Sequence, residues 1–171
     1  MSRDTQKQQV YDAEDVAFYG TALVDRLREP DIESCYRVVI DDPWWNWGSV
    51  GIRNARADMT SAGGVAIGRT IKTSAARVHR YTVSHELAHV VVNCERWHDA
   101  GHGSCFRRAH IHTVGAIFGE PYAELLAESY EVFGLPVDQS PWRHQLPALP
   151  IINIDAFSIA TAPTGGWRRP S

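Results

Sequence analysis

The residues most clearly arranged for chemistry are the five of His85-Glu86-Leu87-Ala88-His89. On a helix, positions i and i+4 lie on one face about one turn apart, so both imidazoles can bind the same ion. Glu86 then lies about 100° round the helix from His85, beside the ion. A carboxylate there can take a proton from a water molecule at the metal and pass it to a leaving amine. Chance gives only roughly 0.02 such motifs in a chain of this composition.

A catalytic zinc site needs three protein ligands and one open position for water. His102, 13 residues after His89, is the favoured third ligand, because the Gly-containing loop before it can turn the chain back to the ion. His110 and His112 are two residues apart, so at most one of them can face the site. Two alternatives for the third ligand stay open, namely His98 and a carboxylate from a later helix, Glu120, Glu124 or Glu128.

One class of metallopeptidase is excluded by the spacing. The metzincin pattern H-E-x-x-H-x-x-G-x-x-H needs Gly at position 92 and His at position 95, where this chain has Val92 and Glu95. The two methionines, Met1 and Met59, both precede the motif, so none can form a Met-turn after it.

The composition limits the class of protein further. The 171 residues are 44% apolar with a net charge of −3, as expected for one ordinary globular domain. A nucleic-acid-binding domain is usually strongly basic, so such a partner is not supported. No apolar run reaches 18 residues and the N-terminus has no signal-peptide pattern, so we expect no membrane span. Three cysteines without C-x-x-C spacing suit a reducing, cytoplasmic location.

The metal-binding pattern needs a helix, which we expect from Thr73 or Ser74 to about Cys94 because apolar residues recur at helical spacing. A helix should follow from Ser104 to Gly119, and another from Pro121 to Gly134. Upstream, we expect a helix from Val10 to about Arg28, ended by Pro30. The β-branched segments predict three strands, at 35–40, 50–57 and 64–71.

Two further clusters have ordinary explanations. The acidic side chains near the N-terminus suggest a solvated helix face; they are Asp12, Glu14, Asp15, Asp25 and Glu29. Trp44, Trp45 and Trp47 could stack on bases or sugars, but we favour a role in covering a small core. The basic pair Arg107 and Arg108 could meet an acidic substrate, although a solvated face is the simpler interpretation.

The order H-E-x-x-H, a short loop and H-G-x-x-F, from His85 to Phe106, resembles the SprT-like zinc metallopeptidases. A wider likeness, over about residues 3–137, is to a group of actinobacterial and actinophage HExxH metallohydrolases. Segments that carry it include Gly64-Val65-Ala66-Ile67 and Phe118-Gly119-Glu120-Pro121. Ser104-Cys105 departs from the Pro-Glu common between H-G and F, and a cysteine there could be oxidised or disturb the metal.

The resemblance implies an α+β, zincin-like fold, which we assign to residues 1–137. The remaining residues, 138–171, are rich in proline, so we expect a tail that wraps the domain or is partly disordered. A small antiparallel sheet would pack on the metal helix, and its edge strand, about 64–70, would bind an extended peptide. By the same match, His85, His89 and His102 would bind Zn²⁺ and Glu86 would be the general base and acid.

The sequence therefore predicts a zinc-dependent hydrolase, with a protein or peptide as the expected substrate. Two other hypotheses stay open. One is a non-catalytic, zinc-stabilised interaction module that uses the Trp cluster and the tail as its surface. The other is a regulatory peptidase specific for one repressor-like protein.

Overall fold

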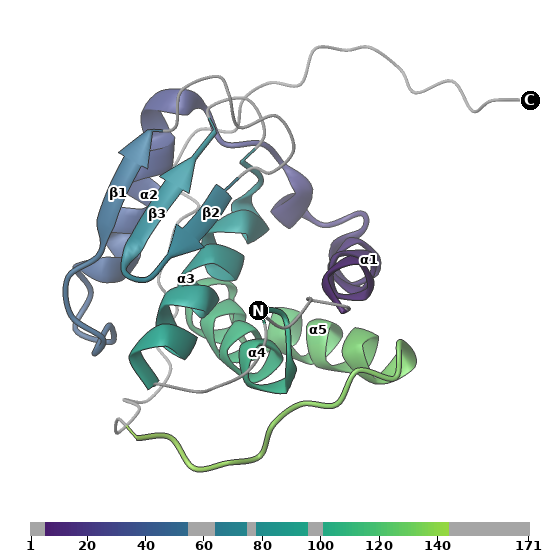
Figure 1. Ribbon diagram of the computed structural model, residues 1–171. Coiled ribbons are helices and arrows are strands. Elements are labelled where there is room, and N and C mark those ends of the chain that lie inside the picture. Colours follow the sequence, from purple (N-terminus) through teal and green to yellow (C-terminus); the bar gives the residue numbers. More distant parts are fainter. Residues whose placement is uncertain (1–5, 55–63, 75–77, 96–100, 144–171) are drawn as a thin grey trace, which may run out of the picture.

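A small sheet and several helices pack around one central helix. The computed structural model describes residues 6–54, 64–74, 78–95 and 101–143. Figure 1 shows α3 in the middle, with the sheet on one side and α1, α4 and α5 on the other. The elements in chain order are α1 (Lys7–Phe18), the 3-10 helix η1 (Ala22–Val24), α2 (Glu29–Ile40), β1 (Gly51–Asn54), β2 (Gly64–Ile67), β3 (Thr70–Thr73), α3 (Arg80–Glu95), α4 (Ser104–Phe118) and α5 (Glu120–Val132).

The α+β class is confirmed, but the sheet is mixed and not purely antiparallel. Its order is β1-β3-β2, in which β1 pairs parallel with β3 and β2 pairs antiparallel with β3. The single strand predicted over 64–71 is a hairpin, because Gly68 adopts a φ of +58° and turns the chain there. Gly64–Ile67 nevertheless lies at an edge of the sheet, as predicted, and packs against α3.

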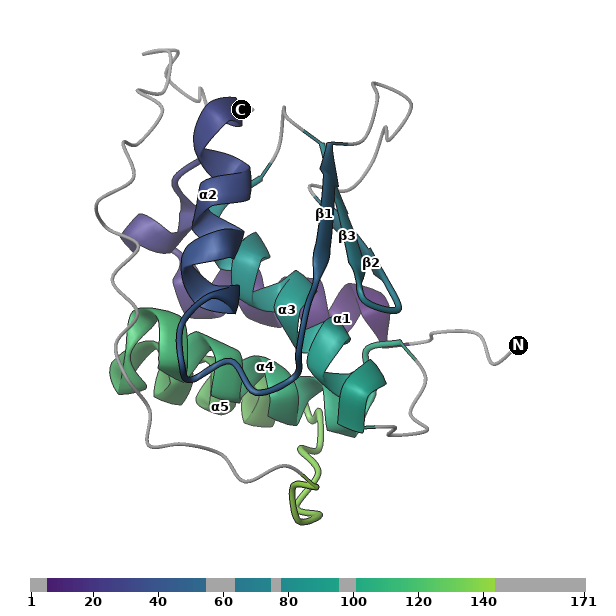
Figure 2. The same ribbon diagram turned by 90° about the vertical axis from the view of Figure 1, so that its left-hand side faces the viewer.

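The strand predicted over 35–40 is wrong, since these residues form the second half of α2. Pro30 does not end a helix but lies in the first turn of this one, where its missing N–H costs nothing. The buried side chains of α2 recur at helical spacing; they are Ile32, Cys35, Tyr36, Val39 and Ile40. Figure 2, in which the sheet is seen nearly edge-on, places α2 on one side of it.

Two helix boundaries also differ from the prediction. The first helix ends at Phe18, ahead of Gly20, whose φ is +76°. The helix that carries the H-E-x-x-H motif begins at Arg80 rather than near Thr73. The chain just before it is extended, because Leu27 N donates to Val78 O at 2.8 Å and Arg80 N donates to Asp25 O at 3.1 Å. The helices predicted from Ser104 and Pro121 are confirmed, with ends at Phe118 and Val132.

The tryptophan cluster is part of the core, as favoured from the sequence. Trp44, Trp45 and Trp47 are all buried, so these rings offer no stacking surface. Trp47 Nε1 donates to Glu95 Oε1 at 2.9 Å, and Arg143 N donates to the other oxygen of this buried carboxylate at 2.8 Å. Residues 138–143, the first of the predicted tail, thus run along the domain; residues 144–171 lie outside the described part. None of the described helices has the length and apolar character needed to cross a membrane.

Candidate metal centre

The three predicted metal ligands meet in one place. His85 and His89 lie one turn apart on α3, and His102 comes from the turn just before α4. Their ligand nitrogens all lie within 4.8 Å of one another, and Nε2 of His85 is 3.2 Å from Nε2 of His102. His85 and His102 are buried, whereas His89 is half-buried. This group of side chains could hold a metal ion.

Phe106, the last residue of the H-G-x-x-F pattern, packs against all three imidazoles. Its ring centroid lies 4.9 Å from that of His85, 4.3 Å from His89 and 4.8 Å from His102. A fully buried phenyl ring restricts how far each imidazole can rotate.

The apolar surroundings also change the pKa of His89. Burial, followed by the neighbouring His85 and His102, lowers the pKa of His89 well below its usual range, which keeps this ring in the neutral form that binds metals.

Arg107 fixes the turn that carries His102. Its guanidinium is buried and donates to the His102 carbonyl oxygen at 2.8 Å and to the Pro136 carbonyl oxygen at 2.6 and 2.8 Å. A further bond reaches Gln6 Oε1 at 2.9 Å. The solvated role expected for Arg107 is therefore wrong: the side chain ties the His102 turn to two other segments. Its neighbour Arg108 lies over the Trp142 ring at 4.5 Å.

Glu86 lies beside the three histidines, buried between α3 and β2. An added Cβ at Gly64 would lie only 2.7 Å from Glu86 Cγ, so only glycine leaves room for this carboxylate. The amide of Ala66 donates a hydrogen bond to it. Its Oε2 is buried and has no hydrogen-bond partner among the described residues. Burial raises the pKa of Glu86, and the charge of His85 and the Ala66 bond only partly offset this.

A second carboxylate, Glu14 of α1, was not predicted at the site. Its Oε1 lies 2.7 Å from His85 Nδ1 and 3.5 Å from His110 Nδ1, and the side chain is only 1% exposed. The solvated role expected for it is therefore wrong. One signal was present in the sequence: Glu14 shares a helix face with the apolar residues Val10, Ala13 and Ala17.

The contact with Glu14 changes the charge balance of His85. Burial by itself lowers the pKa of His85, but the charge of Glu14 and its hydrogen bond, together with Glu86, raise it above its usual value. Glu14, His85 and His110 also form a second group whose ligand atoms lie within 4.8 Å of one another. The two groups share His85: its Nε2 faces His102, and its Nδ1 faces Glu14.

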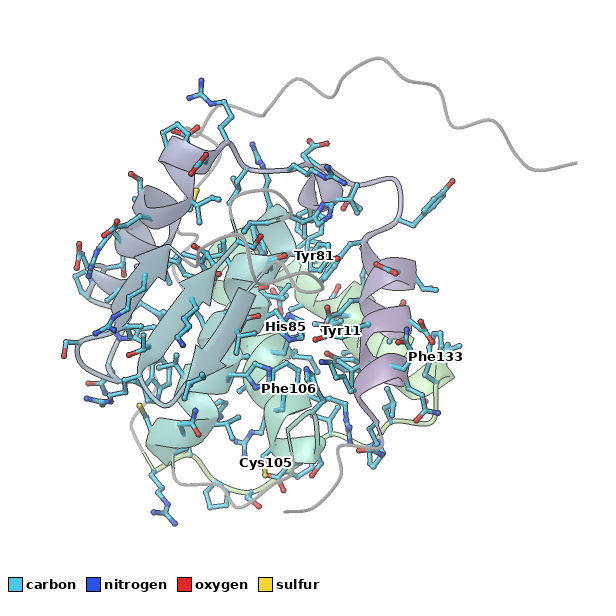
Figure 3. All side chains as sticks on the ribbon, turned by 45° about the horizontal axis from the view of Figure 1, so that its top comes forward. Tyr11, Tyr81, His85, Cys105, Phe106 and Phe133 are labelled. Carbon is cyan, nitrogen blue, oxygen red and sulfur yellow. The ribbon has the colours of Figure 1, made fainter. Side chains whose placement is uncertain are left out.

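Tyr11 lies one turn before Glu14 and covers the site from α1. Its ring centroid is 5.4 Å from that of His85 and 5.3 Å from that of His102. In Figure 3, Tyr11 on α1 and His85 on α3 lie on facing elements, with Phe106 nearby. The exposed Lys7 places its ammonium nitrogen 5.6 Å from the Tyr11 ring centroid. These residues make α1 one wall of the site.

Several predicted alternatives do not reach the three histidines. The carboxylates of Glu120, Glu124 and Glu128 are exposed on α5. His112 packs among the tryptophans, with its ring centroid 5.2 Å from that of Trp44, and burial lowers its pKa to about 4. Cys105 belongs to neither metal-capable group in the described residues. His98 lies outside the described part of the chain.

Comparison of the chain with protein-family models, with curated proteins and with solved structures finds no significant match.

Proposed function

We propose that this chain is a zinc-dependent hydrolase of the HExxH type, and that it cleaves peptide bonds. His85, His89 and His102 would hold one zinc ion, and Glu86 would act as general base and then as general acid. The observation that carries the proposal is the convergence of three imidazole nitrogens beside the buried carboxylate of Glu86, which belongs to neither group of possible metal ligands among the described residues.

The geometry of the histidines fits zinc. Two nitrogens that each lie 2.0–2.1 Å from a tetrahedral zinc ion are roughly 3.3 Å apart. The Nε2 atoms of His85 and His102 are 3.2 Å apart, which is also a hydrogen-bonding distance. Three protein nitrogens and one open position are typical of catalytic zinc sites, whereas structural sites have four protein ligands. The donor set therefore favours a catalytic ion over a structural one.

The environment of Glu86 suits proton transfer. When bound, zinc supplies a Lewis acid that polarises a carbonyl group and lowers the pKa of water. The free Oε2 of Glu86 can accept a proton from the attacking water, and the carboxyl can then donate it to the leaving nitrogen. A raised pKa favours the first step, because a carboxylate with a higher pKa is a stronger base towards the attacking water. The Ala66 amide holds the carboxylate in place during both steps.

The neighbouring edge strand supports a peptide as the substrate. β2 pairs on one side with β3, and the Ala66 amide, on the opposite side, reaches Glu86. An extended peptide that added to this edge would pass next to the general base. Val65 and Ile67 are 38% and 59% exposed and could contact its side chains. An edge strand beside a helix that carries the H-E-x-x-H motif also supports a zincin-like architecture and a relationship to the SprT-like metallopeptidases.

Metal removal tests this function directly. The full chain, loaded with one equivalent of zinc, should cleave an unfolded protein such as reduced, alkylated casein, with new N-termini detected by mass spectrometry. A chelator should abolish cleavage and added zinc should restore it, because the carbonyl is polarised only while the ion is bound. A zinc-loaded chain that cleaves no peptide bond, yet unfolds when the zinc is removed, would instead favour the non-catalytic module.

Gly64 offers a test of the space around the general base. In Gly64→Ala the new Cβ would meet Glu86 Cγ at 2.7 Å, so the carboxylate must move. A displacement of about 1 Å can cost about 10²-fold in rate, and we expect a loss of that order in kcat/KM with zinc affinity unchanged. Peptide-cleavage assays measure kcat/KM, and a zinc titration measures the affinity for the ion.

Gly51→Ala is the matched control, because it adds a methyl group to the same sheet where the nearest atom, Thr70 Oγ1, is at an ordinary 3.4 Å. It should leave kcat/KM unchanged. Equal activity in the two variants would mean that the position of Glu86 does not govern the reaction.

A further inference from the structure

Glu14 needs a physical explanation, because a carboxylate in a protein core is costly. Its side chain is 1% exposed on an otherwise apolar helix face, formed by Val10, Ala13 and Ala17. Transfer of an ionised carboxylate out of water costs several kcal/mol unless strong hydrogen bonds compensate for it. An apolar side chain would pack there at no such cost. The bond partner of Glu14 is therefore the place to look for its role.

That partner is a metal ligand of the proposed centre. Glu14 Oε1 lies 2.7 Å from His85 Nδ1, the nitrogen that faces away from His102. A neutral imidazole carries one proton, and an acceptor at Nδ1 keeps it there. The lone pair is then on Nε2, which faces the other two histidines. A carboxylate hydrogen-bonded to a ligand histidine in this way also makes the ligand nitrogen more basic.

We propose that Glu14 is a positioning residue for the metal centre: its carboxylate accepts the Nδ1–H of His85 and thereby directs the Nε2 lone pair of His85 to the ion. This inference rests on the proposed function and extends it to α1, whose Glu14 lies 71 residues before His85 in the chain. The role is to orient and tune a ligand, and Glu14 itself touches neither substrate nor ion.

The neighbouring His110 argues against a second ion at Glu14. Its Nδ1 lies 2.9 Å from Tyr130 Oη, and its Nε2 lies 3.4 Å from Ser84 Oγ. Both ring nitrogens therefore have partners in the protein, and the group of Glu14, His85 and His110 is explained by hydrogen bonds alone.

Glu14→Leu separates positioning from packing. Leucine fills the site and removes the buried charge, so the metal-free variant should unfold at the same or a higher urea concentration than the parent. Its zinc affinity, measured on the full chain by competition with a chromophoric chelator, should nevertheless fall about 10–100-fold. Nitrogen NMR of the metal-free proteins, at a pH high enough to keep His85 neutral, should find its proton on Nδ1 in the parent and a shift towards Nε2–H in the variant. Asp12→Asn, an exposed change on the same helix, should alter none of these values.

Each other result overturns a different claim. A parent chain that binds one zinc ion, with a Glu14→Leu variant that binds it equally tightly, would overturn the positioning role and leave the proposed function intact. Two zinc ions per parent chain would assign Glu14 to a second metal site instead. A parent chain that binds no zinc would overturn the proposed function, and the role of Glu14 with it.

Discussion

Replacement of Glu86 by Gln should reduce peptide hydrolysis by about 10²–10⁴-fold while zinc remains bound, because general acid–base catalysis contributes about that much. The amide has nearly the shape of the carboxylate and can keep the place beside Gly64, but it can neither accept the proton of the attacking water nor deliver one to the leaving nitrogen. The loss should appear in kcat and kcat/KM together, since the interaction acts in the transition state. Single-turnover cleavage of one peptide, with zinc content measured on the same sample, checks this.

Glu128→Gln is the matched control. Glu128 is exposed on α5 and lies outside both metal-capable groups of the described residues, so the same chemical change there should leave turnover unaltered. If Glu86→Gln instead kept full turnover, the general base would have to be another group, and the arrangement around Glu86 would be structural only.

Replacement of His102 by Ala should weaken zinc binding by more than about 10²-fold. Loss of a residue that only supports a ligand costs about 10–100-fold, and removal of a ligand itself costs more. The two histidines that remain on α3 cannot fill a tetrahedral site. Competition with a chelator measures the affinity, and thermal unfolding of the metal-free forms checks that the variant still folds.

Two controls address the other candidates for the third ligand. His98→Ala removes an imidazole and Glu124→Ala removes an α5 carboxylate, and each variant should bind zinc as tightly as the parent. If either change weakened binding as much as His102→Ala, the third ligand would have been assigned to the wrong segment of the chain.

The local parts of the site could be predicted from sequence because they depend on short spacings. His85 and His89 share a helix face by the 3.6-residue period alone. His102 lies in a turn that can be recognised from Gly101 and Gly103, and Phe106 follows in the first turn of the next helix. The structure places all four rings in contact. No long-range information is needed to bring these groups together.

Glu14 could not be predicted in the same way. Its partner His85 is 71 residues later in the chain. An acidic side chain on a largely apolar helix usually lies where the buried face meets the solvent-exposed face. The contact exists because α1 packs on α5 and against η1, and these tertiary contacts leave no local pattern. Arg107 is a similar case, since its acceptors on Gln6 and Pro136 come from opposite ends of the domain.

The errors in secondary structure have two physical sources. In α2, the β-branched run Val38-Val39-Ile40 suggested a strand, but the helical recurrence of Ile32, Cys35 and Val39 prevailed because that face is buried. In the sheet, the parallel pairing of β1 with β3 depends on a connection through β2, and residue types do not encode strand order.

A zinc anomalous-difference map from crystals of the zinc-loaded full chain tests the central claim most directly. The account predicts one strong peak per chain, 2.0–2.1 Å from a nitrogen of each of His85, His89 and His102, with the Glu86 carboxylate close by but not bound. A peak between Glu14 and His110, or a peak that lacks His102 as a ligand, would contradict it.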